Sequence, residues 1–276
     1  MSTIHHLLTQ HTIFIDGAMG TQLQQRGLHQ DPAQLNLTAA SDIIAIHREH
    51  LAAGADIITA NTFGAYTHKH DNAAQLIKAA IAHGRAALEG QPNKFLALDL
   101  GPTGLMLEPY GDTTEEECYA IFKAAVDAGA PGSDLILIET MMDLTELKLA
   151  VTAAKEADLP IFATMTFDQN GRTMMGNSIS DMVQLLEALE VTAIGMNCGF
   201  GPDAYIPLAQ ELKGQTKLPI VIQPNAGMPV TESDGSIRYD LTAQDFAAAV
   251  ASMGVKIMGG CCGTSPAHIA ALVGKF

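Results

Sequence analysis

The chain has 276 residues, of which 47% are hydrophobic and 16% are charged, and its formal net charge at pH 7 is −15. This length and apolar content are enough for one large domain with a sizeable core, or for two small domains. The negative charge argues against non-specific binding to nucleic acid or to anionic membranes. It fits a protein that meets small molecules or a protein partner.

The composition also bears on the compartment. No apolar run reaches the ~18 residues that a membrane-spanning helix needs, and residues 1–6 lack the basic and apolar regions of a secretory signal. The four cysteines, two of them adjacent, do not form the pattern of a disulfide framework in a chain of this length. We therefore expect a cytoplasmic protein that works under reducing conditions.

Short apolar runs recur along the chain at fairly even spacing, and we expect each to form a β-strand. They are continuous rather than alternating, as in parallel strands that are buried on both faces. The runs cover residues 13–15, 57–60, 95–98, 135–138, 161–165, 193–196, 220–222 and 255–258.

Segments with helical periodicity lie between these runs, and most begin with Asp, Ser or Thr, which are preferred N-caps. Ser41 is the expected cap of the first. The segments cover residues 42–53, 72–88, 114–128, 143–157, 181–189, 203–212, 242–253 and 266–273.

Eight strand–helix units predict an α/β fold, a (β/α)8 TIM barrel, with residues 1–276 forming a single domain. The alternative is a doubly wound open sheet, which suits about six strands and usually has a glycine-rich phosphate turn after the first strand. The turn over residues 16–21 lacks the glycine spacing of that motif.

Three cysteines follow predicted strands, at the end of the barrel where such folds carry their chemistry. Cys198 follows the sixth strand, and Cys261 and Cys262 follow the eighth, in a glycine-rich turn. Barrel closure places them on one rim, two strands apart. Free cysteines are often simple core residues, and Cys118, inside the helix 114–128, is expected to be one. The other three predict a zinc site with three thiolate ligands and an open fourth position.

Carboxylates follow other strands of the same rim. Glu139 comes after four apolar residues, an unfavourable place for a bare charge. Either backbone groups donate to it, or it awaits a cation such as a substrate ammonium. Asp16 has a similar position, and the turn 17–21 offers backbone N–H groups to a carboxylate. Together these features suit a substrate that is an amino acid with a thiol side chain. His68 and His70 are expected to be solvated loop residues.

These stretches resemble the homocysteine S-methyltransferases, most closely the homocysteine-binding barrel domain of cobalamin-dependent methionine synthase. The double cysteine within glycines is the most specific of the matching motifs, and the matches span nearly the whole chain. They lie at residues 16–21, 54–63, 101–104, 138–140, 165–168, 197–198, 224–227 and 259–264.

The resemblance implies a zinc ion on the three cysteines, with the homocysteine sulfur as a fourth ligand during turnover. It also implies that Asn225 is an oxygen ligand or neighbour of the resting site, and that Glu139 and Asp16 hold the substrate's amino end. The further substrate-binding candidates at the strand ends are Gly17, Ala18, Thr21, Asn61 and Thr62.

Cobalamin-dependent methionine synthases carry folate, cobalamin and reactivation domains after this barrel, whereas this chain stops at Phe276. We therefore expect methylcobalamin on a separate corrinoid protein to be the methyl donor. The alternatives are S-methylmethionine, S-adenosylmethionine or betaine as donor, or a corrinoid-protein methyltransferase with another thiol acceptor. A zinc-storage or structural module is disfavoured, because structural zinc sites usually have four protein ligands.

Overall fold

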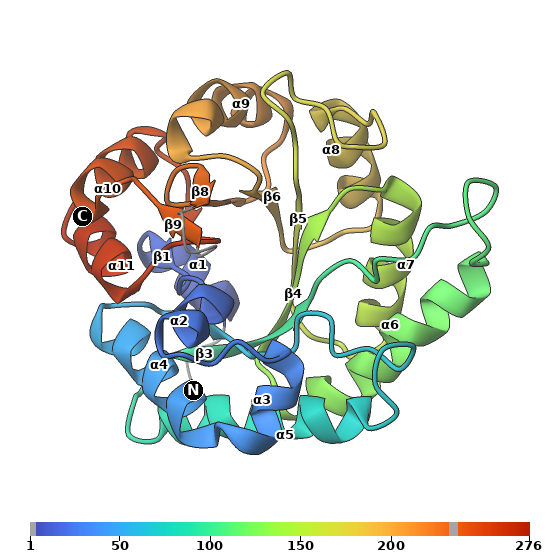
Figure 1. Cartoon of the computed structure of the whole chain (residues 1–276). Coiled ribbons are helices and arrows are strands. Elements are labelled where there is room, and N and C mark those ends of the chain that lie inside the picture. The colour runs from blue at the N-terminus through green and yellow to red at the C-terminus, as the bar shows by residue number, and fades with distance from the viewer. Residues whose placement is uncertain (1–3, 232–236) are drawn as a thin grey trace.

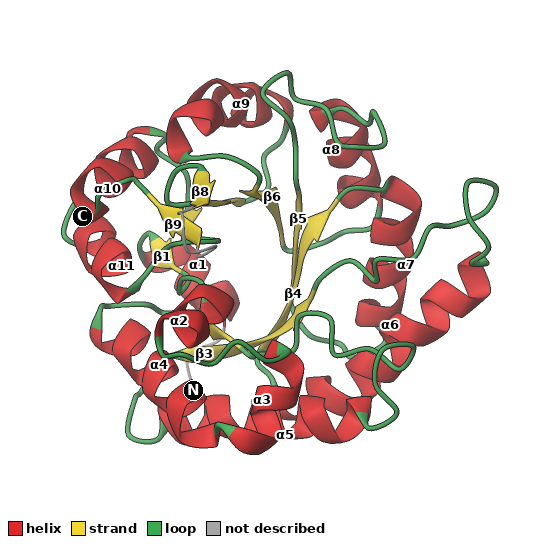
Figure 2. Ribbon diagram, in the orientation of Figure 1, coloured by secondary structure: helices red, strands yellow, loops and turns green. Residues whose placement is uncertain are grey.

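The computed structural model describes residues 4–231 and 237–276. Its strands form a ring that is surrounded by helices (Figures 1 and 2). The eight-stranded sheet has the order β1-β10-β7-β6-β5-β4-β3-β2, and a parallel bridge between Ile15 and Ile57 joins its two edges. The predicted (β/α)8 barrel is therefore confirmed.

The barrel strands fall where the apolar runs predict them. They are β1 (Ile13–Phe14), β2 (Ile57–Thr59), β3 (Phe95–Leu100), β4 (Leu135–Met141), β5 (Ile161–Met165), β6 (Ala193–Cys198), β7 (Ile220–Pro224) and β10 (Ile257–Met258). A separate antiparallel hairpin, which the sequence did not predict, consists of β8 (Pro229–Thr231) and β9 (Ile237–Tyr239).

Each predicted helix is present, with ends shifted by a few residues. They are α4 (Ala40–Ala52), α5 (Ala73–Leu88), α6 (Glu115–Gly129), α7 (Leu144–Lys155), α8 (Ile179–Ala188), α9 (Pro202–Gln215), α10 (Ala243–Ser252) and α11 (Pro266–Val273). Short helices that were not predicted are α1 (Ile4–Gln10), α2 (Met19–Gln25), α3 (Pro32–Thr38) and the 3-10 turn η1 (Ala130–Gly132). Among the described residues no helix is long and apolar enough to cross a membrane.

One local prediction is wrong and a second holds only in part. Ser41 does not cap α4, which begins at Ala40, two residues before the predicted start, and has no side-chain cap. The turn 17–21 is free only in part: the Ala18 N–H donates to the hydroxyl of Thr264 at 3.2 Å, whereas α2 begins at Met19, so that its first N–H groups have no partner within the helix.

Side chains alternate along the barrel strands between the barrel interior and the surrounding helices. Ile57, Ala97 and Leu137 belong to the interior cluster, whereas Ile58 and Leu98 belong to the larger cluster that the helices cover. Ile4 and Leu7 of α1 join the interior cluster, so this helix closes the N-terminal end of the barrel. The chemistry-bearing residues lie at the opposite end.

Candidate metal and substrate site

A cavity of about 370 Å³ opens at the C-terminal ends of the strands. Most of the predicted site residues line it, and they come from widely separated parts of the chain. They are Asp16, Gly17, Ala18, Thr21, Asn61, Glu139, Cys198, Cys261 and Cys262.

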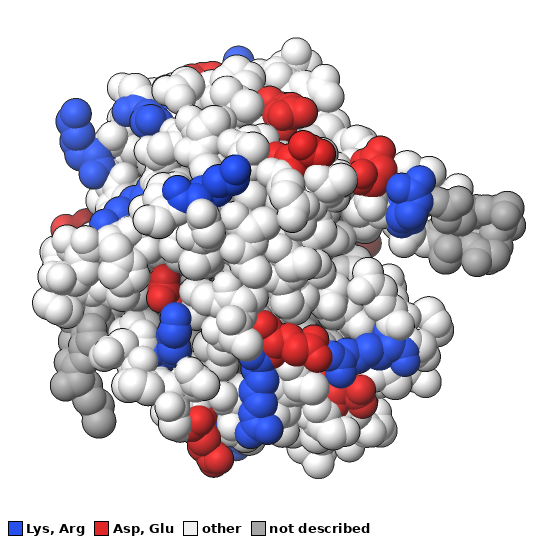
Figure 3. All heavy atoms as spheres, turned by 90° about the vertical axis from the view of Figure 1, so that its left-hand side faces the viewer, with Lys and Arg blue, Asp and Glu red and all other residues white. Residues whose placement is uncertain are grey.

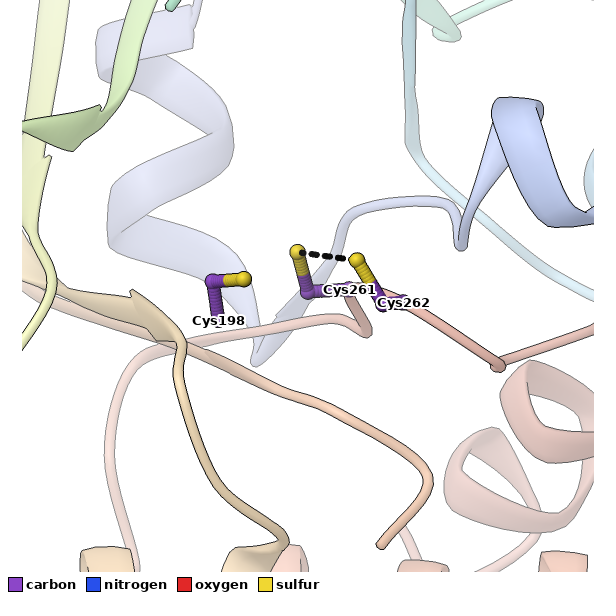
Figure 4. Close-up of side chains that lie close together, drawn as sticks. All are labelled: Cys198, Cys261 and Cys262. Atoms are coloured by element: carbon purple, nitrogen blue, oxygen red, sulfur yellow. Dashed lines mark hydrogen bonds between the residues drawn. The ribbon is translucent and has the colours of Figure 1, made fainter. Parts of the chain in front are cut away.

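The three cysteine sulfurs lie together on one side of this cavity. All three are within 4.8 Å of one another, and Figure 4 shows the Cys198 side chain pointing toward the adjacent pair. Cys198 ends β6 with a left-handed backbone (φ 63°), and Gly199 follows at φ 67°. This paired left-handed turn is a conformation that a cysteine rarely adopts, and it turns the chain sharply at the sulfur cluster.

The donor set fits zinc. A tetrahedral zinc ion with Zn–S bonds of ~2.3 Å holds its sulfurs roughly 3.8 Å apart, and the sulfurs of Cys261 and Cys262 are 4.0 Å apart. Two backbone bonds fix the pair against β7: the Cys261 N–H donates to Pro224 and the Ala226 N–H donates to Cys262, both at 2.9 Å. Cys118 lies apart from this cluster, fully buried in the core as predicted.

The thiols titrate as a group. Hydrogen bonds from Cys198 and Cys261 lower the pKa of Cys262. The pKa of Cys261 is raised well above its usual value by its bonds to the other two sulfurs and by burial. A metal ion binds such sulfurs as thiolates, so that metal binding would release their protons.

Glu139 lines the cavity from the end of β4. None of the described residues donates a hydrogen bond to its carboxylate. Burial, together with the nearby Cys198 and Asp16, raises the pKa of Glu139 to about 8. The sequence left two possibilities open for Glu139: donation by backbone groups, or binding of a cation. Because no described residue donates to it, the carboxylate is available to a cation.

Asp16 has a different environment. Its carboxylate accepts from the backbone N–H of Thr59 at 2.9 Å and from the Thr59 hydroxyl at 3.0 Å. Burial raises its pKa to about 7, and the two Thr59 bonds oppose that shift. These bonds fix the orientation of the carboxylate at the cavity wall, while its remaining lone pairs stay available.

A third carboxylate, Asp99, lines the same cavity and was not predicted as a site residue. It is 6% exposed, and its Oδ1 has no hydrogen-bond partner among the described residues. Burial and the negative neighbours Glu139 and Asp16 raise its pKa well above the usual value. A pattern in the sequence could have found it, because Ala97 faces the barrel interior and Asp99 is two positions further along β3.

The same alternation places more polar residues at the top of the interior. Thr59 and Gln223 each lie two positions after an inward-facing apolar residue of their strand, and Asn197 lies four positions after one. All but Asn197 line the cavity, and Asn197 is fully buried beneath it. The barrel interior thus changes from apolar to polar at this end.

Two predicted substrate-binding residues do not line the cavity in the described part of the chain. The Thr62 hydroxyl donates to the carbonyl of Asp99 at 2.7 Å and is buried, so it holds Asp99 in place. Asn225 is also buried, next to Pro224 and Ala226, which bind the backbone of the cysteine pair, and its Oδ1 has no partner among the described residues. The Asn61 amide donates to Pro32 at 2.6 Å.

The fold and the thiol cluster define a (β/α)8 barrel with a candidate metal site at the end where such barrels carry their active sites. A family model described as homocysteine S-methyltransferase matches residues 13–276. The chain belongs to the homocysteine S-methyltransferase family.

Curated relatives agree with this assignment. The chain is similar to proteins named methionine synthase from Mycobacterium tuberculosis, at 33% identity, and Mycobacterium leprae, at 31% identity, with 95% of the chain covered in each comparison. It spans about a quarter, 24%, of the length of each relative.

Solved structures are similar over the whole chain. The homocysteine methyltransferase MmuM from Escherichia coli matches with a TM-score of 0.83 in its oxidized form and 0.82 in its metallated form. Each comparison covers 98% of both chains at 24% identity. At this identity the likeness bears on the fold alone.

Proposed function

We propose that residues 1–276 form a homocysteine-binding barrel domain that transfers a methyl group to the thiolate of homocysteine and forms methionine. The observation that carries the proposal is one cavity that holds both a cluster of three thiols and a half-buried carboxylate, Glu139, to which no described residue donates a hydrogen bond. A thiol-binding metal site and an ammonium-binding site on the same wall suit an amino acid with a thiol side chain.

Cys198, Cys261 and Cys262 are proposed to hold zinc, which when bound stabilises the thiolate form of the substrate at neutral pH. The donor chemistry and the sulfur separation support this choice over a hard cation such as Mg²⁺, which prefers oxygen ligands. Asn225, with an unpartnered buried oxygen beside the pair, is the proposed oxygen ligand or neighbour of the resting site.

The amino-acid end of the substrate is proposed to bind across the same cavity. Glu139 and Asp16 accept hydrogen bonds from its ammonium, and no Lys or Arg lines the cavity among the described residues to compete for them. The carboxylate end is proposed to contact Gly17, Ala18 and Thr21. Thr21 supports this assignment, because its buried hydroxyl has no partner within the described ranges.

The methyl donor is proposed to be methylcobalamin bound to a corrinoid protein, as the resemblance to the cobalamin-dependent methionine synthases suggests. Exposed apolar side chains in the loops at the C-terminal ends of the strands support a docking surface for such a partner. Met106 and Tyr110 follow β3 and are 57% and 74% exposed, and Met174 follows β5 and is 81% exposed. On the flank drawn in Figure 3, by contrast, basic and acidic side chains are interspersed.

A panel of donors tests this function. Homocysteine is incubated with free methylcobalamin, a methylated corrinoid protein, S-methylmethionine, S-adenosylmethionine or betaine, and methionine is measured. We expect turnover with a corrinoid form, and fastest with the protein-bound one. Turnover on S-methylmethionine alone would replace the corrinoid partner with a small-molecule donor, and turnover of another thiol in preference to homocysteine would replace the acceptor.

We also propose that the protein works in the reducing cytoplasm. All four cysteines are free, three of them within reach of one another. In an oxidising compartment such a cluster would be prone to disulfide formation, which would remove the thiolates that the metal needs.

A further inference from the structure

Strand β4 is irregular at the point where it reaches the cavity. Its pairing with β5 shifts register between Ile138 and Met141, so that Glu139 and Thr140 together lie opposite one residue of β5, Thr164. Such a β-bulge interrupts the ordinary alternation of side chains along a strand. As a result, two consecutive residues, Glu139 and Thr140, both line the cavity.

Thr140 has a backbone conformation that is rare for its residue type. Its φ is 63°, in the left-handed region, where the branched side chain of a threonine is crowded by the backbone. A residue stays in this region only when the surrounding structure holds it there. The hydrogen bonds of Thr140 identify the group that does so.

The side chain of Asn197 on β6 binds Thr140 through both ends of its amide. Its Oδ1 accepts from the Thr140 backbone N–H at 2.7 Å, and its Nδ2 donates to the Thr140 hydroxyl at 2.8 Å. On β5, the strand between them, the Thr164 hydroxyl donates to the same Oδ1 at 2.7 Å. A backbone N–H can only donate, which fixes the orientation of the amide. These three bonds form the Asn197 clamp, and Asn197 and Thr164 are both fully buried.

The clamp lies next to the thiol cluster. Asn197 directly precedes Cys198 in the chain, and its Nδ2 lies 3.9 Å from the sulfur of Cys261. Glu139 directly precedes Thr140. Asn197 therefore contacts the thiol side of the cavity itself and reaches the carboxylate side through Thr140.

We propose that Asn197 is a positioning residue, which directs Glu139 into the cavity by holding Thr140 in the left-handed conformation. The inference rests on the proposed function, in which Glu139 accepts a hydrogen bond from the ammonium of homocysteine. No described residue donates to the Glu139 carboxylate, so its direction depends on the backbone that carries it. Without the clamp, Thr140 relaxes toward an ordinary conformation and the carboxylate turns away from the ammonium.

The test compares two ligands that differ only in the ammonium group. Homocysteine and γ-mercaptobutyrate share the thiol and the carboxylate, but γ-mercaptobutyrate has no amino group. Their affinities for the zinc-loaded protein are measured by isothermal titration calorimetry. Asn197→Ala should weaken homocysteine binding about tenfold, as the loss of one hydrogen bond to a charged group predicts, and should leave γ-mercaptobutyrate binding unchanged. An equal loss for both ligands would mean a general disturbance of the site and would overturn the proposal.

Thr164→Val and Thr166→Val test the clamp with smaller changes, which keep the fold even if Asn197→Ala does not. Each removes one hydroxyl that donates to Asn197. Thr164 donates to the side-chain oxygen at 2.7 Å, whereas Thr166 donates to the backbone carbonyl at 3.0 Å. Thr164→Val should therefore lower the affinity for homocysteine relative to γ-mercaptobutyrate, and Thr166→Val should keep the wild-type ratio. The same ratio in both variants would contradict the proposal.

A crystal structure of Asn197→Ala provides a readout that needs no ligand. Residue 140 should leave the left-handed region, and the Glu139 carboxylate should move away from its place at the cavity wall. A φ at Thr140 that stays near 63° would overturn the proposal. The proposed function fails separately, if the zinc-loaded wild-type protein neither binds homocysteine nor forms methionine, and the structure of the variant still decides whether Asn197 holds Thr140 and Glu139 in place.

Discussion

The Oε1 oxygen of Glu146 on α7 accepts two hydrogen bonds from Thr103, one from its backbone N–H at 2.8 Å and one from its hydroxyl at 2.6 Å. Both residues are buried. Thr103 is the third residue of the Gly-Pro-Thr-Gly motif that follows β3, the strand that carries Asp99. The motif therefore anchors the loop to a helix on the outside of the barrel, and its threonine has a structural role.

Thr103→Val tests this role. The substitution keeps the shape and removes the hydroxyl, so that a hydrogen bond to a buried carboxylate is lost, together with the bond that the hydroxyl accepts from the Leu105 N–H at 3.2 Å. We expect the free energy of unfolding in urea to fall by ~1.5–3 kcal/mol, with zinc content unchanged. Thr152→Val on the surface of α7, which loses only a bond to the Lys148 carbonyl, is the control. An equal effect in both variants would argue against an anchoring role for Glu146.

The metal prediction concerns the cysteine pair. Cys262→Ser should abolish tight zinc binding, since it removes one of three thiolates, whereas the wild-type protein purified under reducing conditions should hold about one zinc per chain. Cys118→Ala removes a thiol that is buried in the core away from the cluster and should leave the zinc content unchanged. Metal is measured by inductively coupled plasma mass spectrometry. Stoichiometric zinc in a variant that lacks both Cys261 and Cys262 would exclude this site.

Glu139→Gln should weaken homocysteine binding roughly tenfold or more, because a charge-assisted hydrogen bond contributes ~1.5–3 kcal/mol. Zinc should stay in place. Glu115→Gln, on the surface at the start of α6, is the control for a change of charge. Binding is measured by isothermal titration calorimetry, and an affinity equal to wild type would remove Glu139 from the substrate site.

The effect of Glu139→Gln should depend on pH. Burial raises the pKa of Glu139 to about 8, so below that pH the wild-type carboxyl is largely neutral before the ammonium binds, as the glutamine always is. The affinity ratio of wild type to variant should therefore increase from pH 6.5 to pH 8.5. The ionisation of the substrate's thiol affects both proteins alike and cancels from the ratio.

A separate pH effect comes from two buried histidines of α4. Burial lowers the pKa of His47 to about 3 and that of His50 to about 4, against ~6.5 in an unfolded chain. Between these values the unfolded chain binds protons that the folded protein does not. The contribution of the two neutral histidines to the stability of the folded protein is therefore complete above pH ~6.5, and it is lost progressively as the pH falls toward their folded-state pKa values.

His47→Leu should reduce this acid sensitivity. One such group changes the free energy of unfolding by up to ~1.4 kcal/mol per pH unit, and the variant should lose that slope between about pH 4.5 and 6. Unfolding in urea with a chelator present measures the slope without a contribution from metal release. His29→Gln on the surface should keep the wild-type slope, and an unchanged slope in His47→Leu would contradict the assignment.

Continuous apolar runs were sufficient to predict every barrel strand, because strands that are buried on both faces leave no other place for such runs. The alternation of side chains along each strand also predicts which positions face the barrel interior, and the apolar runs alone do not show this. Asp99 and Asn197 lie at inward-facing positions of β3 and β6, where the alternation of side chains along a strand could have found them. The apolar run that predicted β3 stopped at Leu98, so Asp99 lay outside the predicted strand and was not named as a site residue.

The hairpin of β8 and β9 could not be predicted in this way. β8 and β9 have three residues each, and most of their side chains are exposed, so they show no hydrophobic periodicity. At the base of the hairpin the Leu241 N–H donates to Ala226, which itself donates to Cys262, and such contacts between distant parts of the chain leave no pattern in the sequence. Helix α1 was not predicted for a related reason. Only Ile4 and Leu7 of its seven residues are buried apolar side chains, too few to show a helical period. A helix this short is stabilised mainly by its packing against the barrel interior.

The groups that hold the sulfurs and the loops that expose apolar side chains belong to different strands. The three thiols come from the end of β6 and from the turn after β10, whereas Met106 and Met174 lie in loops after β3 and β5. Mutations can therefore accumulate in one set without disturbing the other. If the proposed function is right, the loops after β3 and β5 could change to suit another methyl donor while the three cysteines stay the same.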